Sequence, residues 1–241
     1  MKSDAFGRAI HDYQRGKMDE PLIQRDGKEA REHPVEENYF GELDPTAGKR
    51  GGWRVSWLDG PLLDMGAGAG RDTVYFQDHF ETVAIEVSEH LVETMRERGV
   101  NDARYADMFA LRKTFERDRF QSALAIGTQL GLAGSMQGLR QFLGDLAFVT
   151  TSDATAVLDG FDPEEEESAN MLGYRADPTT GLAYRVMHFE YECDVDKTLL
   201  FRLFSPDRVQ EAVVGTEWDV AKISRPTNTY RPHYQVALSK S

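Results

Sequence analysis

The sequence is poor in cysteine, in long apolar runs and in basic residues. Its one cysteine, Cys193, cannot form an internal disulfide bond, so we expect a protein of the reducing cytoplasm. Residues 1–17 are too polar for a secretory signal peptide. The longest mainly apolar run, residues 122–134, is too short and too rich in glycine to cross a bilayer. We therefore expect no association with a membrane.

The shortage of basic residues makes the chain strongly acidic. Its 241 residues include 41 Asp and Glu but only 28 Lys and Arg, which gives a formal net charge of −13. One interpretation is a halophilic protein, in which salt screens the repulsion between carboxylates; the other is an acidic protein of ordinary salt concentrations. In either case we expect no nucleic-acid partner, because DNA and RNA are themselves anionic.

The chain divides into two regions by its apolar pattern. Residues 1–58 are polar and charged, and they predict an N-terminal helical extension that acts as a lid. From residue 59 onward, short apolar runs alternate with amphipathic segments, which predicts a domain of residues 59–241 on a mostly parallel sheet. The predicted strands are residues 61–65, 82–86, 103–107, 122–126 and 154–160, and the predicted helices are residues 71–80, 88–98 and 136–146.

Beyond residue 160 the pattern changes. Residues 182–204 predict two long strands around a turn, an antiparallel β-hairpin inserted into the domain. A helix should follow, with Ser205 as its N-cap and Pro206 at its first position. Residues 218–224 and 233–239 then predict a closing pair of strands.

A glycine-rich stretch follows the first predicted strand: residues 61–76 read PLLDMGAGAGRDTVYF. A strand that turns through glycines into a helix places backbone N–H groups around a ligand. The dinucleotide fingerprint G-x-G-x-x-G fails, because Arg71 or Thr73 stands where its third glycine is needed. Asp64 would repel a pyrophosphate, whereas a carboxylate suits a ligand with a cationic amine.

This stretch resembles motif I of the class I S-adenosylmethionine-dependent methyltransferases. Two more acids stand where that family has them: Glu86 ends the second strand, for the ribose hydroxyls, and Asp107 ends the third, for the adenine amino group. The resemblance implies a Rossmann-like, doubly wound α/β fold with seven strands, an antiparallel closing strand and S-adenosylmethionine as cofactor. The residues it implies at the cofactor are Asp64, Gly66, Ala67, Gly68, Gly70, Glu86, Val87, Asp107, Met108 and Gly127.

The resemblance is clear over residues 60–160 and has departures. Gln121 stands where many members have an aspartate early in the fourth strand. The stretch GTQLG replaces the Asn/Asp-Pro-Pro-Tyr/Phe motif that methylates nucleobase amines, and there is no Pro-Cys pair for cytosine C5 methylation. The absence of these two motifs argues against a nucleobase as the acceptor.

The catalytic residues are not fixed by the sequence, because methyl transfer from a sulfonium needs a base only when the acceptor carries a proton. In residues 184–191 alternate side chains share a face, so Tyr184 and His188 would lie on one face and Met187 on the other. If the hairpin covers the pocket, His188 is a candidate general base, and Tyr184 and Tyr13 are further catalytic candidates; an ordinary strand histidine is the alternative. Four residues of the extension are candidates to close over donor or acceptor: Tyr13, Arg25, Tyr39 and Phe40.

We therefore predict a methyltransferase that acts on a small molecule. The alternatives are an RNA or protein methyltransferase, a nucleotide-binding reductase of similar fold, and a binding module without turnover. The histidines show no metal-ligand spacing, so we predict no metal. The sequence leaves open whether the protein is a monomer or a homodimer.

Overall fold

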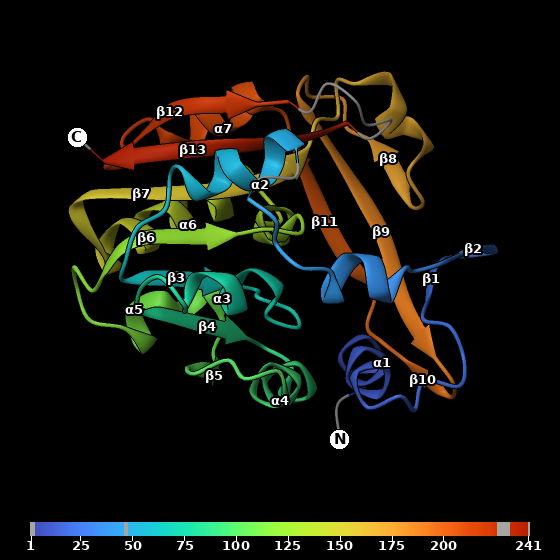
Figure 1. The fold of residues 1–241 in the computed structure, drawn as a ribbon. Helices are drawn as coiled ribbons and strands as arrows, with labels where there is room; N and C mark the ends of the chain where they lie inside the picture. The colour runs from blue at the N-terminus through green and yellow to red at the C-terminus, as the bar shows by residue number, and fades with distance from the viewer. Residues whose placement is uncertain (1–2, 46–47, 226–231, 241) are drawn as a thin grey trace.

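The computed structural model describes residues 3–45, 48–225 and 232–240. They form a seven-stranded sheet with helices on both faces and a six-stranded sheet beside it (Figure 1). Within these ranges, no helix combines the length and the apolar character that crossing a membrane requires.

The seven-stranded sheet confirms the predicted α/β architecture. Its order is β12-β13-β7-β6-β3-β4-β5, and the pairs from β7 to β5 are parallel whereas β13 is antiparallel to both of its neighbours. The strands are β3 (Leu62–Met65), β4 (Thr82–Glu86), β5 (Ala103–Tyr105), β6 (Phe120–Ala125), β7 (Thr150–Phe161), β12 (Trp218–Ser224) and β13 (His233–Lys240).

Helices cover both faces of this sheet because the parallel strands are buried on both sides. One face packs on α5 (Leu111–Thr114), α6 (Met136–Val149) and α7 (Pro206–Val213). The other packs on α2 (Gly48–Val55), α3 (Arg71–Phe76) and α4 (Glu89–Glu97). The predicted caps hold: Ser88 and Ser205 accept hydrogen bonds from the first turns of α4 and α7, and Pro206 opens α7.

The predicted hairpin is part of a larger sheet. Its strands β9 (Leu182–Tyr191) and β11 (Leu199–Phe204) pair antiparallel as expected, and the two-residue strand β10 (Asp194–Val195) extends the turn. The other edge of β9 takes β8 (Tyr174–Ala176) and β1 (Ile23–Asp26), which pairs with β2 (Glu29–Glu32).

The N-terminal extension is therefore only partly helical, which corrects the expectation of a helical lid. It contains α1 (Ala5–Gln14) and the π-helical turn η1 (Glu36–Phe40), but between them lies the β1–β2 hairpin. These strands are polar and show no alternation of burial. They are extended because β1 pairs with the free edge of β9 and β2 pairs with β1. The pairing with β9 is a tertiary interaction that the local sequence does not reveal. Residues 1–2 and 46–47 of the predicted extension lie outside the described ranges.

Candidate functional site

The glycine-rich loop between β3 and α3 is the centre of the site. Gly66 and Gly68 have φ angles of 63° and 60°, a left-handed conformation that favours glycine. A Cβ on Gly66 would approach the Gln129 side chain to 2.5 Å, and one on Gly68 would approach the Tyr39 ring to 3.2 Å. The lack of a side chain at these two positions therefore lets Gln129 and Tyr39 pack directly against the backbone of the loop.

Asp64 lies at the end of β3 and is buried, with 3% of its surface exposed. Its Oδ2 accepts a hydrogen bond of 2.6 Å from the Thr73 hydroxyl. Burial, with the nearby Asp72 carboxylate, raises the pKa of Asp64 to about 7, against the hydrogen bond from Thr73 and the charge of Arg54. A cationic ligand group beside this carboxyl would favour its ionised form.

Glu86 lies at the end of β4, next to the glycine-rich loop. Its Oε1 accepts from the Gly68 N–H at 2.9 Å and its Oε2 from the Val87 N–H at 3.0 Å. Burial raises the pKa of the Glu86 carboxyl, although the two backbone hydrogen bonds oppose the shift. The structure thus brings together Glu86 and the loop, as the spacing predicted, while the Val87 side chain is exposed.

Asp107 and Met108 follow β5 at the same edge of the sheet. Asp107 is exposed, and its Oδ1 accepts from the Phe109 N–H at 2.8 Å, which caps a 3₁₀ turn, η2 (Met108–Ala110). This cap ends β5 at Tyr105, two residues before the predicted end. Met108 is buried, with 5% exposed. Because β3, β4 and β5 are parallel, the acids that end or follow them meet at one edge.

Gly127 follows β6 in a loop held by a residue that sequence reasoning missed. Asp159 accepts from the Gly127 N–H at 3.1 Å, from the Thr128 N–H at 2.6 Å and from His233 Nε2 at 2.7 Å. Burial opposes the ionisation of Asp159, but these hydrogen bonds and the charge of His233 lower its pKa. They also hold Thr128 at a φ of 65°, in the left-handed region. Only the pairing of β7 with β13 brings Asp159 and His233 together.

The N-terminal extension covers the glycine-rich loop. The Tyr39 ring lies over Gly68, and its hydroxyl is 2.8 Å from His33 Nε2. Arg98 joins the two segments, because its Nη1 donates to the carbonyls of both Tyr39 and Ala69, at 3.0 and 2.7 Å. Two of the predicted lid residues, Tyr13 and Phe40, pack ring on ring at 4.8 Å.

Solved structures with this architecture exist, although no protein-family model matches the sequence and a search of curated proteins finds no match. A methyltransferase from Bacteroides fragilis, solved with S-adenosyl-L-homocysteine, superposes with a TM-score of 0.79 at 19% identity, over 99% of this chain and 95% of that one. The chain has the fold of the S-adenosylmethionine-dependent methyltransferases.

Two further proteins with this methyltransferase fold are similar over the larger part of the chain. One is a 1,6-didemethyltoxoflavin-N1-methyltransferase from Burkholderia thailandensis, with a TM-score of 0.52 and 17% identity over 75% of this chain and 70% of that one. The other is an amino pentose methyltransferase from Micromonospora echinaspora, with a TM-score of 0.54 and 15% identity over 75% and 83%. The Bacteroides protein matches almost the whole chain, and these two match about three quarters of it.

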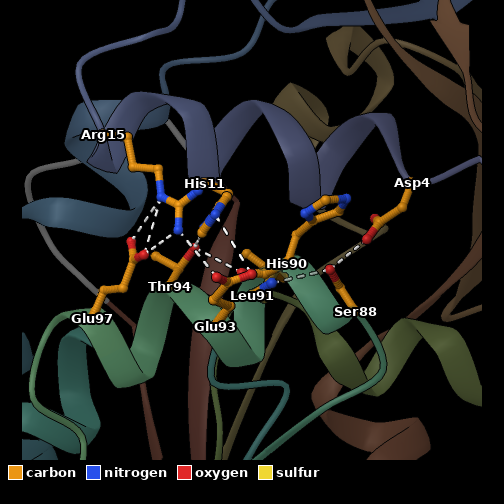
Figure 2. Close-up of polar contacts among 9 residues, drawn as sticks. All are labelled: Asp4, His11, Arg15, Ser88, His90, Leu91, Glu93, Thr94 and Glu97. Atoms are coloured by element: carbon orange, nitrogen blue, oxygen red, sulfur yellow. Dashed lines mark hydrogen bonds and ion pairs between the residues drawn. The ribbon is translucent and has the colours of Figure 1, made fainter.

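In this methyltransferase fold, α1 is attached to α4, the helix that follows Glu86 (Figure 2). His11 Nδ1 lies 2.9 Å from the Thr94 hydroxyl, and the Ser88 hydroxyl donates to Asp4 at 2.5 Å. Figure 2 shows Arg15 reaching from α1 toward two glutamates of α4, Glu93 and Glu97, and it ion-pairs with both. We call this set of contacts the α1–α4 latch.

The latch also contains a group of possible metal ligands. One ligand atom each from His11, Glu93 and Glu97 lies within 4.8 Å of the others. Arg15 ion-pairs with both glutamates, however, and supplies the positive charge that a metal ion would bring. We therefore treat these residues as an ion-paired helix contact.

The structure does not bring His188 and Tyr184 to the glycine-rich loop. The face of β9 that packs on the methyltransferase core carries Met187, Phe189 and Tyr191, in one cluster with Ala69 of the loop. His188 and Tyr184 alternate with these residues and lie on the other face. There His188 pairs with Glu190 at 3.0 Å, and Arg25, which we expected near a ligand, pairs with the same glutamate at 2.8 Å.

Proposed function

We propose that the protein transfers a methyl group from S-adenosylmethionine to a small-molecule acceptor. The observation that carries this proposal is the contact between Glu86 and Gly68, in which the carboxylate at the end of β4 binds the backbone of the glycine-rich loop. It lies at the edge of a sheet with the methyltransferase fold. The neighbouring proteins from Bacteroides and Micromonospora were solved with S-adenosylhomocysteine and S-adenosylmethionine, respectively.

The residues at this edge fit such a cofactor. Gly66 and Gly68 leave the loop without side chains where Gln129 and Tyr39 pack on it. The carboxylate of Asp64 would contact a cationic amine, and that of Glu86 the ribose hydroxyls. Asp107 and Met108 would then flank the adenine. The cofactor supplies an activated methyl group, so the chain's own contribution is to align the acceptor and exclude water. Tyr39 and the second sheet cover the loop and would exclude water from it.

A small-molecule acceptor is supported by this cover and by charge. The N-terminal extension and β9 both pack on the loop side of the core, which leaves little room for a macromolecular acceptor. A net charge of −13 disfavours RNA. Two of the structural neighbours carry the names of small-molecule methyltransferases, one for a toxoflavin precursor and one for an amino pentose. The cytoplasmic setting, the salt-tolerant source and a possible homodimer stay predictions.

Calorimetric titration in molar KCl tests the proposed cofactor. We expect S-adenosylhomocysteine to bind once per chain and NADH not to bind. The variant Glu86→Gln should bind it at least about tenfold more weakly, since a hydrogen bond to a charged group contributes roughly 1.5–3 kcal/mol. Glu116→Gln is the matched control, because Glu116 is exposed and remote from the loop.

Two results would contradict the proposal. Binding of NADH in place of S-adenosylhomocysteine would favour the reductase alternative. Equal affinity of the Glu86→Gln and Glu116→Gln variants for S-adenosylhomocysteine would mean that the ligand does not reach Glu86. Bulk RNA, tested for a mobility shift at the same salt concentration, separates a macromolecular acceptor from a small one.

A further inference from the structure

Two arginines lie on the inner face of the second sheet, the face that packs on the core. Arg185 shares this face with Met187 and Phe189 by the alternation of β9. Arg31 shares it by register, because Gln24 is paired with Phe189 and Arg31 with Gln24. Each of the two arginines comes from a different strand, β9 and β2.

Neither arginine has a carboxylate partner within the described residues. Arg185 donates through Nε to the Leu172 carbonyl at 2.8 Å, and its Nη2 lies 3.5 Å from the Met187 sulfur. Arg31 donates to the Asn170 carbonyl at 3.2 Å. The backbone contact orients the Arg185 guanidinium but does not neutralise it, and Nη1 makes no hydrogen bond to a described residue.

A neighbouring arginine of the same sheet does have a carboxylate partner. Arg202, on the strand next to Arg185, pairs with Asp177 at 2.6 Å. At Arg185, burial and the positive charge of Arg31 lower the pKa to about 10, which leaves the group charged at neutral pH. A half-buried, unneutralised guanidinium is costly unless something else supplies the negative charge.

Arg185 lies beside the loop that follows β6. It lines a small cavity with Thr128 and Gly131 of that loop and with Phe201 of β11. The loop is the one that Asp159 holds through Gly127 and Thr128. The cavity therefore opens next to the edge of the sheet where the cofactor and acceptor are proposed to meet.

We propose that Arg185, with Arg31 beside it, binds an anionic group of the acceptor, a carboxylate or a phosphate. This inference rests on the proposed function and adds the chemical class of the substrate. A guanidinium matches either group through parallel N–H donors, and the apolar Phe201 ring beside it suits the carbon part of an acceptor.

Thermal unfolding of the full chain tests this proposal with three probes at constant ionic strength in KCl: benzoate, inorganic phosphate and the neutral benzamide. The variants are Arg185→Met and, as control, Arg117→Met. Arg117 is exposed, lies over the Phe148 ring and has no carboxylate partner within the described residues. Calorimetry with S-adenosylhomocysteine is run on both variants.

We expect one of the two anions to raise the melting temperature of the wild type and of Arg117→Met by roughly 3–6 °C at ten times its dissociation constant. Benzamide should not raise the melting temperature of either protein. The melting temperature of Arg185→Met should rise with neither anion. A larger shift with benzoate identifies a carboxylate, and a larger shift with phosphate identifies a phosphate. Arg185→Met should also unfold no earlier than the wild type without a probe, because it loses an unneutralised charge.

The proposal is overturned if neither anion stabilises the wild type, if benzamide acts as strongly as benzoate, or if Arg185→Met keeps the response. A large loss of stability in Arg185→Met without probe would also show that the arginine is structural. Normal binding of S-adenosylhomocysteine in both variants would separate such a failure from a failure of the methyltransferase proposal.

Discussion

At the scale of single residues, the acids beneath the glycine-rich loop are the most unusual feature. Asp64 and Asp72 are both buried, and Asp72 is neutralised by the buried Arg54 at 2.7 Å. Among the described residues, Asp64 has only the Thr73 hydroxyl as a hydrogen-bond partner. It is thus the carboxyl at this edge whose ionisation is least supported by its surroundings.

The titration of Asp64 should be visible in the stability of the protein. Its pKa is about 7 in the folded chain, against 3.8 for an unperturbed aspartate, so between these values the folded state holds the extra proton. Stability should therefore fall as pH rises from about 4 to 7, by up to roughly 4 kcal/mol. The side chain of Asp64→Asn does not titrate, so the variant should lose less stability than the wild type between pH 5 and pH 8. Urea unfolding at these two pH values measures both losses.

Asp78→Asn, an exposed change beyond the C-terminal end of α3, is the control and should follow the wild type. If Asp64→Asn loses stability between pH 5 and pH 8 as steeply as the control, Asp64 is ionised over this whole pH range. The raised pKa of its buried carboxyl would then be contradicted.

The positions of the proposed cofactor-site residues could be predicted because each lies at the end of a strand or within a few positions after it. The spacing that placed Asp64, Glu86 and Asp107 is local, and parallel pairing does the rest. Asp159 and Arg185 could not be found in this way. Their positions depend on which residue of one strand pairs with which residue of another, and a single sequence does not give that register.

At the scale of elements, the α1–α4 latch attaches the N-terminal extension to the core. Gly7 lies in α1 where it faces the latch, and a Cβ there would overlap the Ser88 hydroxyl and come within 2.6 Å of Asp4. Gly144 lies in α6 with open space around its position. The same substitution should therefore have opposite effects in the two helices.

We expect Gly144→Ala to stabilise the protein by about 0.5–1 kcal/mol, since alanine loses less backbone entropy in a helix. Gly7→Ala should destabilise it by about 1–3 kcal/mol, because the overlap outweighs that gain. Chemical unfolding measures both. An equally stabilised Gly7→Ala would show that α1 does not dock against Ser88 as the structure has it.

The elements also show what a pattern of burial can reveal. Strands such as β3 and β4 of the main sheet were predicted because they are mainly apolar, as buried strands are. The strands β1 and β2 were not, because each is polar and reads as part of a charged extension. They form because β9 pairs with β1, which in turn pairs with β2, and neither propensity nor periodicity carries that information.

At the scale of the whole molecule, the net charge of −13 should make stability depend on salt. Repulsion among exposed carboxylates destabilises the compact state, and the Debye length falls from about 10 Å at 0.1 M salt to about 3 Å at 1 M. We expect the melting temperature to rise with KCl over this range. The triple variant Glu164→Gln, Glu166→Gln, Glu167→Gln removes three exposed negative charges and should show a weaker rise.

The comparison keeps the variant and the wild type in the same buffer. Glu165 is left in place because it pairs with Arg225 at 2.8 Å. A melting temperature that is independent of KCl in the wild type would contradict the halophilic interpretation and favour the ordinary acidic protein.

The pairing of β1 with β9 has a consequence for how the chain is made. Arg25 and Glu190 are 165 positions apart in the sequence, yet their strands share a sheet. On the ribosome, β1 emerges long before β9 and has only its neighbour β2 to pair with while the core between them is synthesised. Strand β1 is therefore translated before the core and takes its place beside β9 only after the core has been made.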